Sequence, residues 1–240
     1  ISLLEEDEEH LTSTSCELKF TNISYYISNR AGQPTELALL DRVSGHVSPG
    51  EMCAMMGASG AGKSTLLDLL AQRKNTGKLA GEIRYNQGLR VHSLAYVLED
   101  NVHLALLTVR ESIFYSALLR LPEAWTEERK QRRVETILHM LALQDVADNF
   151  VGSETARGIS GGQLKRLSIA VEIVHLPAIM FLDEPTTGLD SATSFEVVSA
   201  MRRLANHSRT IVATIHQPSR RSFELFDKLL LLGKGRVLYF

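Results

Sequence analysis

Between residues 57 and 65 the chain reads Gly57-Ala58-Ser59-Gly60-Ala61-Gly62-Lys63-Ser64-Thr65, which matches the pattern G-x-x-x-x-G-K-[ST]. The apolar run at residues 52–56 predicts a buried strand before it, and residues 64–73 predict a helix after it. A loop in this position points backbone amides and the positive end of the helix at phosphate groups. Lys63 is expected to reach the β- and γ-phosphates of a nucleotide, and the Ser64 hydroxyl to ligate Mg²⁺. The stretch therefore predicts a phosphate-binding loop (P-loop), a feature that many classes of nucleotide-binding protein share.

An apolar run that ends in two carboxylates supports the same interpretation. Residues 178–182 predict a strand, and Asp183 and Glu184 follow it directly. In a P-loop fold this strand runs beside the loop, so Asp183 is expected to hold Mg²⁺, directly or through water. Glu184 is expected to polarise the water that attacks the γ-phosphate. A strand that ends in a solvated acidic turn is the common alternative, but the P-loop upstream favours the functional interpretation.

The distribution of apolar residues predicts an α/β fold with two β regions. Strand patterns occur at residues 178–182 and 210–215, and a helical segment separates each predicted strand from the following one, which favours a parallel sheet. Near the N-terminus, residues 18–23 and 37–43 predict a two-stranded region, with a turn at residues 29–34.

The middle of the chain predicts helices alone. Between residues 108 and 151 no strand pattern occurs, and Thr126 is placed to cap a helix with Glu127 and Glu128 in its first turn. One apolar face of that helix repeats at helical spacing, at Val134, Ile137, Leu138 and Leu141. We therefore expect a helical subdomain inserted into the α/β core.

Composition excludes several classes of protein. The chain has 240 residues, of which 44% are hydrophobic and 22% charged, with a net charge of -2, so nucleic acid is not expected as a partner. Cys16 and Cys53 match no spaced metal-binding pattern. Within these residues we expect neither a membrane span nor a signal peptide, because no apolar run is long enough and the chain opens on an acidic run at residues 5–9. Residues 1–15 predict a flexible acidic tail, and the apolar residues 237–240 at the end suggest a domain cut from a longer protein.

One further motif identifies a family. The string Ile159-Ser160-Gly161-Gly162-Gln163 precedes a helical run and resembles the signature loop of ATP-binding cassette (ABC) proteins. The resemblance implies that residues 160–163 bind the γ-phosphate of an ATP molecule held by a second, identical or different, ABC domain. It also implies that Asp190, in Gly188-Leu189-Asp190, contacts the partner domain as the D-loop residue.

Two more roles follow from the same resemblance. His216, just after the predicted strand at residues 210–215, occupies the place of the histidine that contacts the γ-phosphate. An aromatic residue near the N-terminus stacks on adenine in this family, and Tyr25 is our candidate. Tyr26, on the other face of the strand, stays an alternative, and so does a packing role for Tyr25.

The resemblance covers the chain from about residue 18 to its end. It implies a P-loop NTPase fold with a mainly parallel core sheet, an N-terminal antiparallel β region and a helical subdomain at about residues 105–175. Residues 16–240 would form one ATPase domain, and the expected cofactors are ATP and Mg²⁺. The P-loop residues, together with Tyr25 and Glu99, would form the ATP site of each domain.

Several strings resemble the G subfamily of ABC transporters, the white-type proteins. They lie at residues 66–71, 107–111, 183–191, 216–219 and 223–227. This resemblance implies a C-terminal transmembrane domain outside these 240 residues, with the present domain on the cytoplasmic face of a multi-pass membrane protein. It also implies export of lipids, sterols or amphipathic drugs. A soluble ABC ATPase is the rival, although the segment between P-loop and signature lacks sustained heptads.

Glu99 departs from the family pattern. The family has glutamine where this chain reads Tyr96-Val97-Leu98-Glu99-Asp100. A carboxylate at this position can still ligate Mg²⁺, but it adds negative charge near the phosphates. Glu99 therefore indicates either a slow, regulatory site in an asymmetric transporter or a tolerated substitution, and both interpretations stay open.

Overall fold

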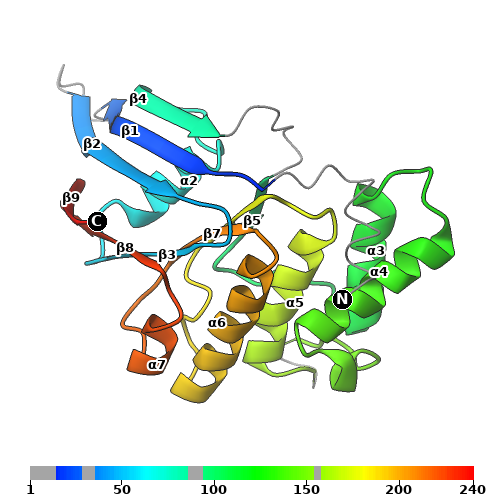
Figure 1. The fold of residues 1–240 in the computed structure, drawn as a ribbon. Coiled ribbons are helices and arrows are strands. Elements are labelled where there is room, and N and C mark those ends of the chain that lie inside the picture. Colours follow the sequence, from blue (N-terminus) through cyan, green and yellow to red (C-terminus); the bar gives the residue numbers. More distant parts are fainter. Residues whose placement is uncertain (1–14, 29–35, 86–93, 154–157) are drawn as a thin grey trace.

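The computed structural model describes residues 15–28, 36–85, 94–153 and 158–240, and its strands form two sheets (Figure 1). The smaller sheet is antiparallel, in the order β2-β1-β4, with β1 at Leu18–Ser28, β2 at Glu36–Val47 and β4 at Lys78–Tyr85. The sequence predicted only the first two of these strands. The sequence did not predict β4, because the first five residues of this strand are exposed and show no alternation of apolar and polar residues.

The larger sheet has six strands, in the order β5-β6-β7-β3-β8-β9. Its five neighbouring strands from β5 to β8 run parallel, which confirms the predicted parallel core, and β9 pairs antiparallel with β8. The strands span Leu94–Val97 (β5), Ile179–Leu182 (β6), Thr210–Thr214 (β7), Met52–Gly57 (β3), Lys228–Gly233 (β8) and Arg236–Tyr239 (β9).

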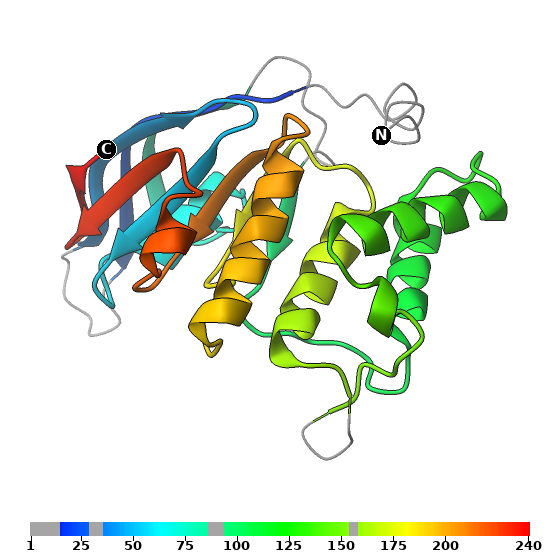
Figure 2. The same cartoon turned by 60° about the horizontal axis from the view of Figure 1, so that its bottom comes forward.

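Helices cover both faces of this sheet. Helix α2 (Lys63–Leu70) follows β3, and α6 (Ser191–Ala205) and the short α7 (Arg220–Phe223) follow β6 and β7. The predicted helical part contains α3 (Val109–Arg120), α4 (Glu127–Met140), a 3₁₀ turn η2 (Gln144–Val146) and α5 (Gly161–Ile173). Figure 2 shows these helices gathered to one side of the sheet, with α5 beside α6.

Local sequence explains where these helices begin. The Thr126 side chain accepts a hydrogen bond from the Arg129 amide, so it caps α4 as predicted. Thr108 and Ser160 each form a full capping box, with Glu111 and Gln163 respectively. The predicted apolar face of α4, at Val134, Ile137, Leu138 and Leu141, is buried.

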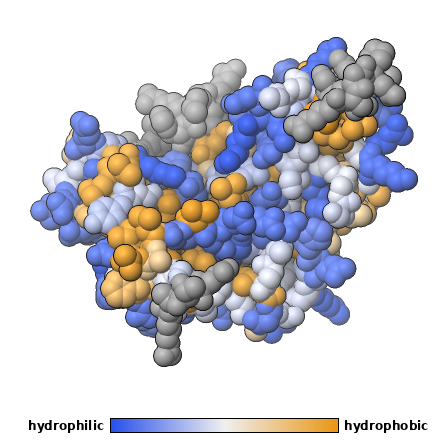
Figure 3. All heavy atoms as spheres, turned by 180° about the vertical axis from the view of Figure 1, so that it is seen from behind, coloured by the Kyte–Doolittle hydropathy of each residue, from blue (hydrophilic) through white to orange (hydrophobic). Residues whose placement is uncertain are grey.

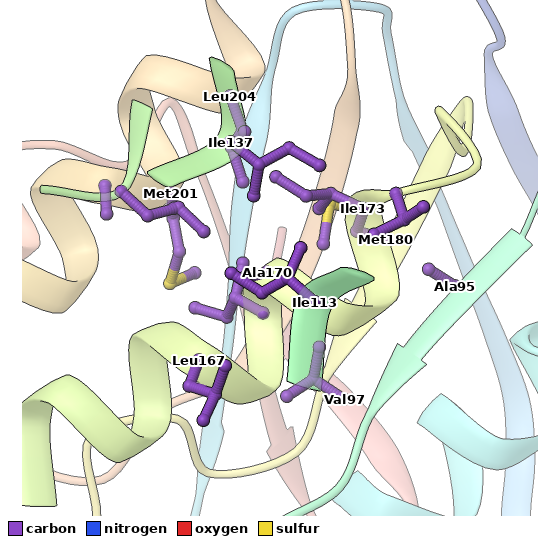
Figure 4. Close-up of a cluster of buried hydrophobic side chains, with 14 of the residues drawn as sticks. Ala95, Val97, Ile113, Ile137, Leu167, Ala170, Ile173, Met180, Met201 and Leu204 are labelled. Atoms are coloured by element: carbon purple, nitrogen blue, oxygen red, sulfur yellow. The ribbon is translucent and has the colours of Figure 1, made fainter. Parts of the chain in front are cut away.

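Two apolar clusters lie on opposite faces of the central sheet because strand residues alternate between its faces. Met180 and Leu182 of β6 belong to the cluster with α3, α5 and α6, whereas Ile179 and Phe181 belong to the cluster beneath the small sheet. Figure 4 shows the first cluster, where Leu167 and Ile173 of α5 lie near Met180 and Met201. Both faces of β6 are therefore buried, which fixes the position of the carboxylates that follow it.

The surface keeps several large apolar side chains exposed. Four of them, Val102, Leu104, Leu106 and Leu119, are at least 71% exposed and lie between β5 and the end of α3. Figure 3 shows apolar residues interspersed with hydrophilic ones on the side opposite to that of Figure 1. The described part of the chain has no helix with the length and apolar character of a membrane span. The predicted turn at residues 29–34 and all but the last residue of the predicted N-terminal tail lie outside the described residues.

Candidate nucleotide-binding site

The P-loop connects β3 to α2, as its sequence predicted, and its conformation requires glycine. Gly62, directly before α2, has φ +98°, and a Cβ there would lie 2.8 Å from Leu40 Cδ2. At Gly57 a Cβ would lie 2.3 Å from the backbone oxygen of Leu232. Since Gly62 is the N-cap residue and has no side chain, it leaves the first amides of α2 to another acceptor. The loop thus has the free amides and the backbone shape that a phosphate site needs.

Lys63 lies folded against the loop. Its Nζ donates hydrogen bonds to the backbone oxygens of Gly57 at 3.0 Å and Ala58 at 3.1 Å, and the residue is only 6% exposed. These bonds hold the ammonium group over the same loop whose amides are available to phosphate. The side chain is therefore in place to meet an anion that enters the loop.

Asp183 lies at the end of β6, where three hydroxyl groups surround its carboxylate. Oδ1 accepts hydrogen bonds from Thr214 Oγ1 at 2.7 Å and from Ser64 Oγ at 3.2 Å, and Oδ2 accepts one from the Tyr96 hydroxyl at 3.4 Å. Burial, with a further contribution from the Asp183 charge, raises the pKa of Tyr96, so its hydroxyl stays protonated and donates. The predicted pair of magnesium ligands, Ser64 and Asp183, is therefore brought together from two distant segments.

Glu184, the next residue, is held by three contacts. Its backbone N–H donates to Thr214 Oγ1 at 2.7 Å, and its Oε2 accepts from the Thr187 hydroxyl at 2.8 Å. Oε1 lies 2.9 Å from His216 Nε2. The backbone of Glu184 has φ +46°, in the left-handed region that non-glycine residues rarely adopt. Such outliers cluster at functional positions, and here the outlier accompanies a carboxylate held between Thr187 and His216.

The donors at this site suit Mg²⁺. Ser64 and Asp183 present oxygen atoms, which this hard cation prefers, and Mg²⁺ typically takes only one or two protein ligands beside substrate phosphates. Over the residues that the structure describes, no group of three or more His, Cys, Asp or Glu side chains could hold a metal ion. The two oxygen ligands at Ser64 and Asp183 thus fit a cation shared with a nucleotide.

Glu99 lies beside these carboxylates because of strand register. Val97 pairs with Leu182 in the parallel β5–β6 ladder, and the Asp183 amide donates to the Val97 oxygen at 2.9 Å. Two residues beyond Val97, Glu99 is exposed, and its backbone oxygen accepts a hydrogen bond from Lys165 Nζ. The structure therefore places Glu99 at the edge of the sheet where Asp183 and Glu184 also emerge.

The signature residues form the start of α5. Ser160 and Gly161 are exposed, and Ser160 and Gln163 complete the capping box at 2.8 and 3.3 Å. Gly162 packs against α6, where an added Cβ would lie 2.1 Å from Thr193 Cγ2. The Asp190 carboxylate caps α6 by accepting hydrogen bonds from the Ala192 and Thr193 amides at 2.9 and 3.1 Å. The exposed signature and D-loop residues thus start two helices that are packed together.

The prediction that Tyr25 stacks on adenine is wrong. The residue is 1% exposed, and its hydroxyl donates a hydrogen bond to the Thr76 backbone oxygen, so its ring has no free face for adenine. The packing alternative therefore describes Tyr25 in this structure. Tyr25 was misassigned because alternation along β1 shows that two tyrosines face opposite ways but not which way is inward. Tyr26 is partly exposed and becomes the candidate for adenine stacking.

Sequence reasoning missed three residues that support the two carboxylates. Thr214 contacts both Asp183 and Glu184, Tyr96 contacts Asp183, and Thr187 contacts Glu184. A signal existed for Thr214, since it precedes His216 by two residues and strand side chains repeat every two residues. Tyr96 and Thr187 carry no such signal. The contact of Tyr96 with Asp183 depends on the packing of two segments that are distant in sequence, and the contact of Thr187 with Glu184 depends on the conformation of a tight turn.

The fold and this cluster define a P-loop nucleotide-binding protein with an ABC signature helix. The sequence profile of the ABC transporter family matches residues 40–187, more than half of the chain. The chain therefore belongs to the ABC transporter family, as its signature residues predicted.

Similar proteins carry G-family names. The chain is 44% identical to ABC transporter G family member 24 of Dictyostelium discoideum, over 98% of this chain and 22% of that protein. It is 42% identical to the broad substrate specificity ATP-binding cassette transporter ABCG2 of Bos taurus, over 92% of this chain and 35% of that protein. The chain therefore spans well under half the length of these relatives.

A solved structure confirms the fold. The ATP-binding cassette MJ0796, captured as a dimer in a post-hydrolysis state bound to ADP and Pi, superposes with a TM-score of 0.70 at 22% identity. The match covers 92% of this chain and 97% of that one.

Replacing Thr214 by Val tests the support of the carboxylates. The variant keeps the shape of the side chain but removes the hydroxyl that bonds Asp183 and the Glu184 amide. Because such supporting contacts typically contribute 10–100-fold to activity, we expect ATP hydrolysis to fall by about that factor. Thr210→Val is the matched control, since Thr210 begins the same strand and its hydroxyl bonds Cys16 and Ser48. Equal rates for the two variants would show that the Thr214 hydroxyl is dispensable.

Proposed function

We propose that this chain is the nucleotide-binding domain of a G-subfamily ABC transporter and hydrolyses Mg-ATP in a head-to-tail pair of such domains. One observation carries the proposal: the ends of β3, β6 and β7 bring the P-loop, two carboxylates and a histidine into one bonded cluster. The bonds from Ser64 and Thr214 to Asp183, and from His216 to Glu184, define that cluster. Helix α5 supports the pairing because it presents Ser160 at its exposed start.

The residues divide the chemistry between them. Amides of residues 57–65 and the Lys63 ammonium bind the β- and γ-phosphates of ATP. Ser64 and Asp183 hold Mg²⁺, which supplies positive charge against the phosphate oxygens when it is bound. Glu184 orients a water molecule and takes its proton as the water oxygen attacks the γ-phosphorus. The bond to the ADP oxygen breaks in the same displacement, so products are ADP and phosphate.

His216 and the second domain complete the site. The His216 ring lies 2.9 Å from the Glu184 carboxylate. We propose that it donates a hydrogen bond to the γ-phosphate. The signature loop of the second domain, residues 160–163, adds a hydroxyl and backbone amides at a helix N-terminus. Asp190 lies in the exposed loop next to that signature and contacts the partner across the interface. ATP thus joins the two domains, and its hydrolysis releases them.

Coupling to transport needs a surface for a membrane domain. Leu98 and Leu119 line a cavity of about 620 Å³, together with Tyr96, Arg120 and Glu172. Exposed Val102, Leu104 and Leu106 precede α3 nearby in the chain. An exposed apolar surface of this kind favours a protein partner. We propose that the transmembrane domain contacts this surface, and that the nucleotide-binding domain lies on the cytoplasmic face of the membrane.

The substrate class is proposed from the resemblance to the G subfamily. The bovine relative is named for broad substrate specificity, and several others are named as G family members. Export of lipids, sterols or amphipathic drugs is the activity that we propose for the whole transporter.

A regulatory site is the second candidate function, and Glu99 is the observation that favours it. Glu99 follows β5 at the edge of the sheet where Asp183 and Glu184 follow β6, and a glutamine in its place would be neutral. Added negative charge near ATP weakens phosphate binding and slows the approach of a nucleophile. In that case this domain binds ATP and closes the pair while the other site turns over.

The rate of ATP hydrolysis by the purified chain, measured across protein concentrations with Mg²⁺, tests the proposal. If two copies form the active pair, the specific rate rises with concentration because dimers accumulate. Bound ATP without turnover at any concentration would contradict self-pairing with two active sites. Restored turnover in Glu99→Gln would then show that Glu99 silences the site, whereas no restoration would favour a different partner chain.

A further inference from the structure

A line of polar side chains on α5 is bonded to the segment that carries Glu99. Lys165 is 3% exposed and its Nζ donates to the Glu99 backbone oxygen. One turn further, the Ser168 hydroxyl donates to Asn101 Oδ1 at 2.9 Å and lies 2.8 Å from His103 Nε2. Residues three and four positions apart share a helix face, so these bonds form one polar seam between α5 and residues 99–103.

The seam continues to the far end of the helix. Glu172, four residues after Ser168, receives two hydrogen bonds of 2.8 Å from the Arg120 guanidinium at the end of α3. The segment from Glu99 to Arg120 is therefore tied to α5 at three successive levels. Bidentate pairs between Arg and carboxylates have a narrow geometry, so the far end of the segment is well oriented.

Lys165 is the member of the seam nearest to the proposed site. Burial lowers the pKa of Lys165, and the carboxylates of Glu99, Asp100, Asp183 and Glu184 act against that shift. The ammonium thus lies within electrostatic reach of the groups that the proposed function assigns to Mg²⁺ and to the attacking water. A buried charge needs such hydrogen bonds and countercharges to be tolerated.

We propose that Lys165 is a positioning residue. Its hydrogen bond to the backbone oxygen of Glu99 holds the segment that carries Glu99, and this determines the position of Glu99 relative to Asp183. Because α5 begins at Ser160, the same helix that presents the signature loop to the partner's ATP also holds the metal-facing segment of its own site. Closing the pair on one nucleotide would then adjust the metal site on the other. The inference rests on the proposed function, since it assumes that Glu99 and Asp183 face the cation.

Lys165→Met tests the inference by ATP binding with and without Mg²⁺, measured by titration calorimetry in the Glu184→Gln background to prevent turnover. The measured quantity is the factor by which Mg²⁺ strengthens ATP binding. We expect this factor to be smaller in Lys165→Met than in the parent by about 10-fold or more, the usual scale for contacts that orient metal ligands. Binding of ATP in EDTA should stay the same, because the P-loop is untouched. Lys130→Met is the matched control, since Lys130 is also buried but lies on α4.

Two further variants keep the inference falsifiable. Ser168→Ala removes the next bond of the seam with a smaller change and should shift the Mg²⁺ dependence in the same direction. Measuring Lys165→Met also in a chain that carries Glu99→Gln distinguishes two roles of Lys165: positioning the segment, and compensating the charge of the Glu99 carboxylate. The two roles separate because the hydrogen bond to the backbone oxygen does not depend on the Glu99 side chain. An equal loss in both backgrounds supports positioning. A loss that Glu99→Gln cancels would overturn it, as would a Mg²⁺ dependence unchanged in both Lys165→Met and Ser168→Ala.

Failure of the inference differs from failure of the proposed function. If Mg²⁺ strengthens ATP binding in the parent but Lys165→Met leaves this effect intact, the proposed site stands and the positioning role is wrong. If Mg²⁺ has no effect on ATP binding in the parent and Asp183→Asn changes nothing, the proposed site itself is wrong.

Discussion

Glu184→Gln is expected to reduce ATP hydrolysis by about 100-fold to 10,000-fold, the range that general base catalysis contributes. The amide has the same shape as the carboxylate, and its oxygen can still accept the Thr187 hydrogen bond. It cannot take a proton from water at neutral pH, so the step that Glu184 is proposed to assist loses its base. ATP binding should persist, because the P-loop, Lys63 and Asp183 are unchanged.

Single-turnover hydrolysis and size-exclusion chromatography with Mg-ATP measure the two halves of this expectation. The variant should accumulate as an ATP-bound dimer, since hydrolysis is what releases the pair in the proposed cycle. Glu224→Gln is the matched control, because Glu224 is an exposed carboxylate just after α7 that pairs with the exposed Arg220. Hydrolysis within a few-fold of the parent in Glu184→Gln would remove Glu184 from the role of base.

The second large effect is expected from mixing two inactive variants. Lys63→Ala removes the ammonium that the P-loop holds, and Ser160→Arg blocks the exposed start of α5. Each variant alone contains the same defect in both sites of its pair and should be inactive. In a mixed head-to-tail pair, both defects fall in one site and the other site is intact. Random mixing would leave about a quarter of the sites intact, so activity should reappear.

Activity is measured at fixed total protein while the ratio of the two variants is changed, and it should peak at equal amounts. Arg220→Ala mixed with Lys63→Ala serves as a control for non-specific effects, because Arg220 is exposed outside the proposed interface residues. In that mixture, every site whose P-loop comes from an Arg220→Ala chain stays intact, so activity should rise in proportion to the share of Arg220→Ala chains, without a peak. A flat response for Lys63→Ala with Ser160→Arg would contradict sites built from two copies of this chain.

Local patterns predicted much of the candidate site because its chemistry is concentrated in contiguous segments. The P-loop stretch requires a strand before it and a helix after it, and β3 and α2 occupy those places. Asp183 and Glu184 follow a strand whose four residues are all buried, which the apolar run at residues 178–182 indicated. The apolar face of α4 was equally readable, because helical spacing appears directly in the order of residues.

Other elements had no local signal. β4 was missed because it is held by pairing to β1 while most of its residues stay exposed, so its apolar pattern is weak. The inward face of β1 could not be chosen from alternation, which is why Tyr25 was predicted to stack on adenine and lies buried. Burial is a property of the neighbouring sheet and helix and not of the strand itself.

Sequence alone thus determined the nucleotide-binding class, the family and the order of strand, loop and helix around the phosphates, because these depend on short-range backbone geometry. The tertiary structure decided which distant groups meet. Thr214 joins Asp183 to the Glu184 backbone, and Lys165 reaches the Glu99 segment from a helix 66 residues later. Such contacts require parallel strands in a particular order and a helix packed at their edge, and hydrogen bonds form only where that packing brings donor and acceptor within about 3 Å.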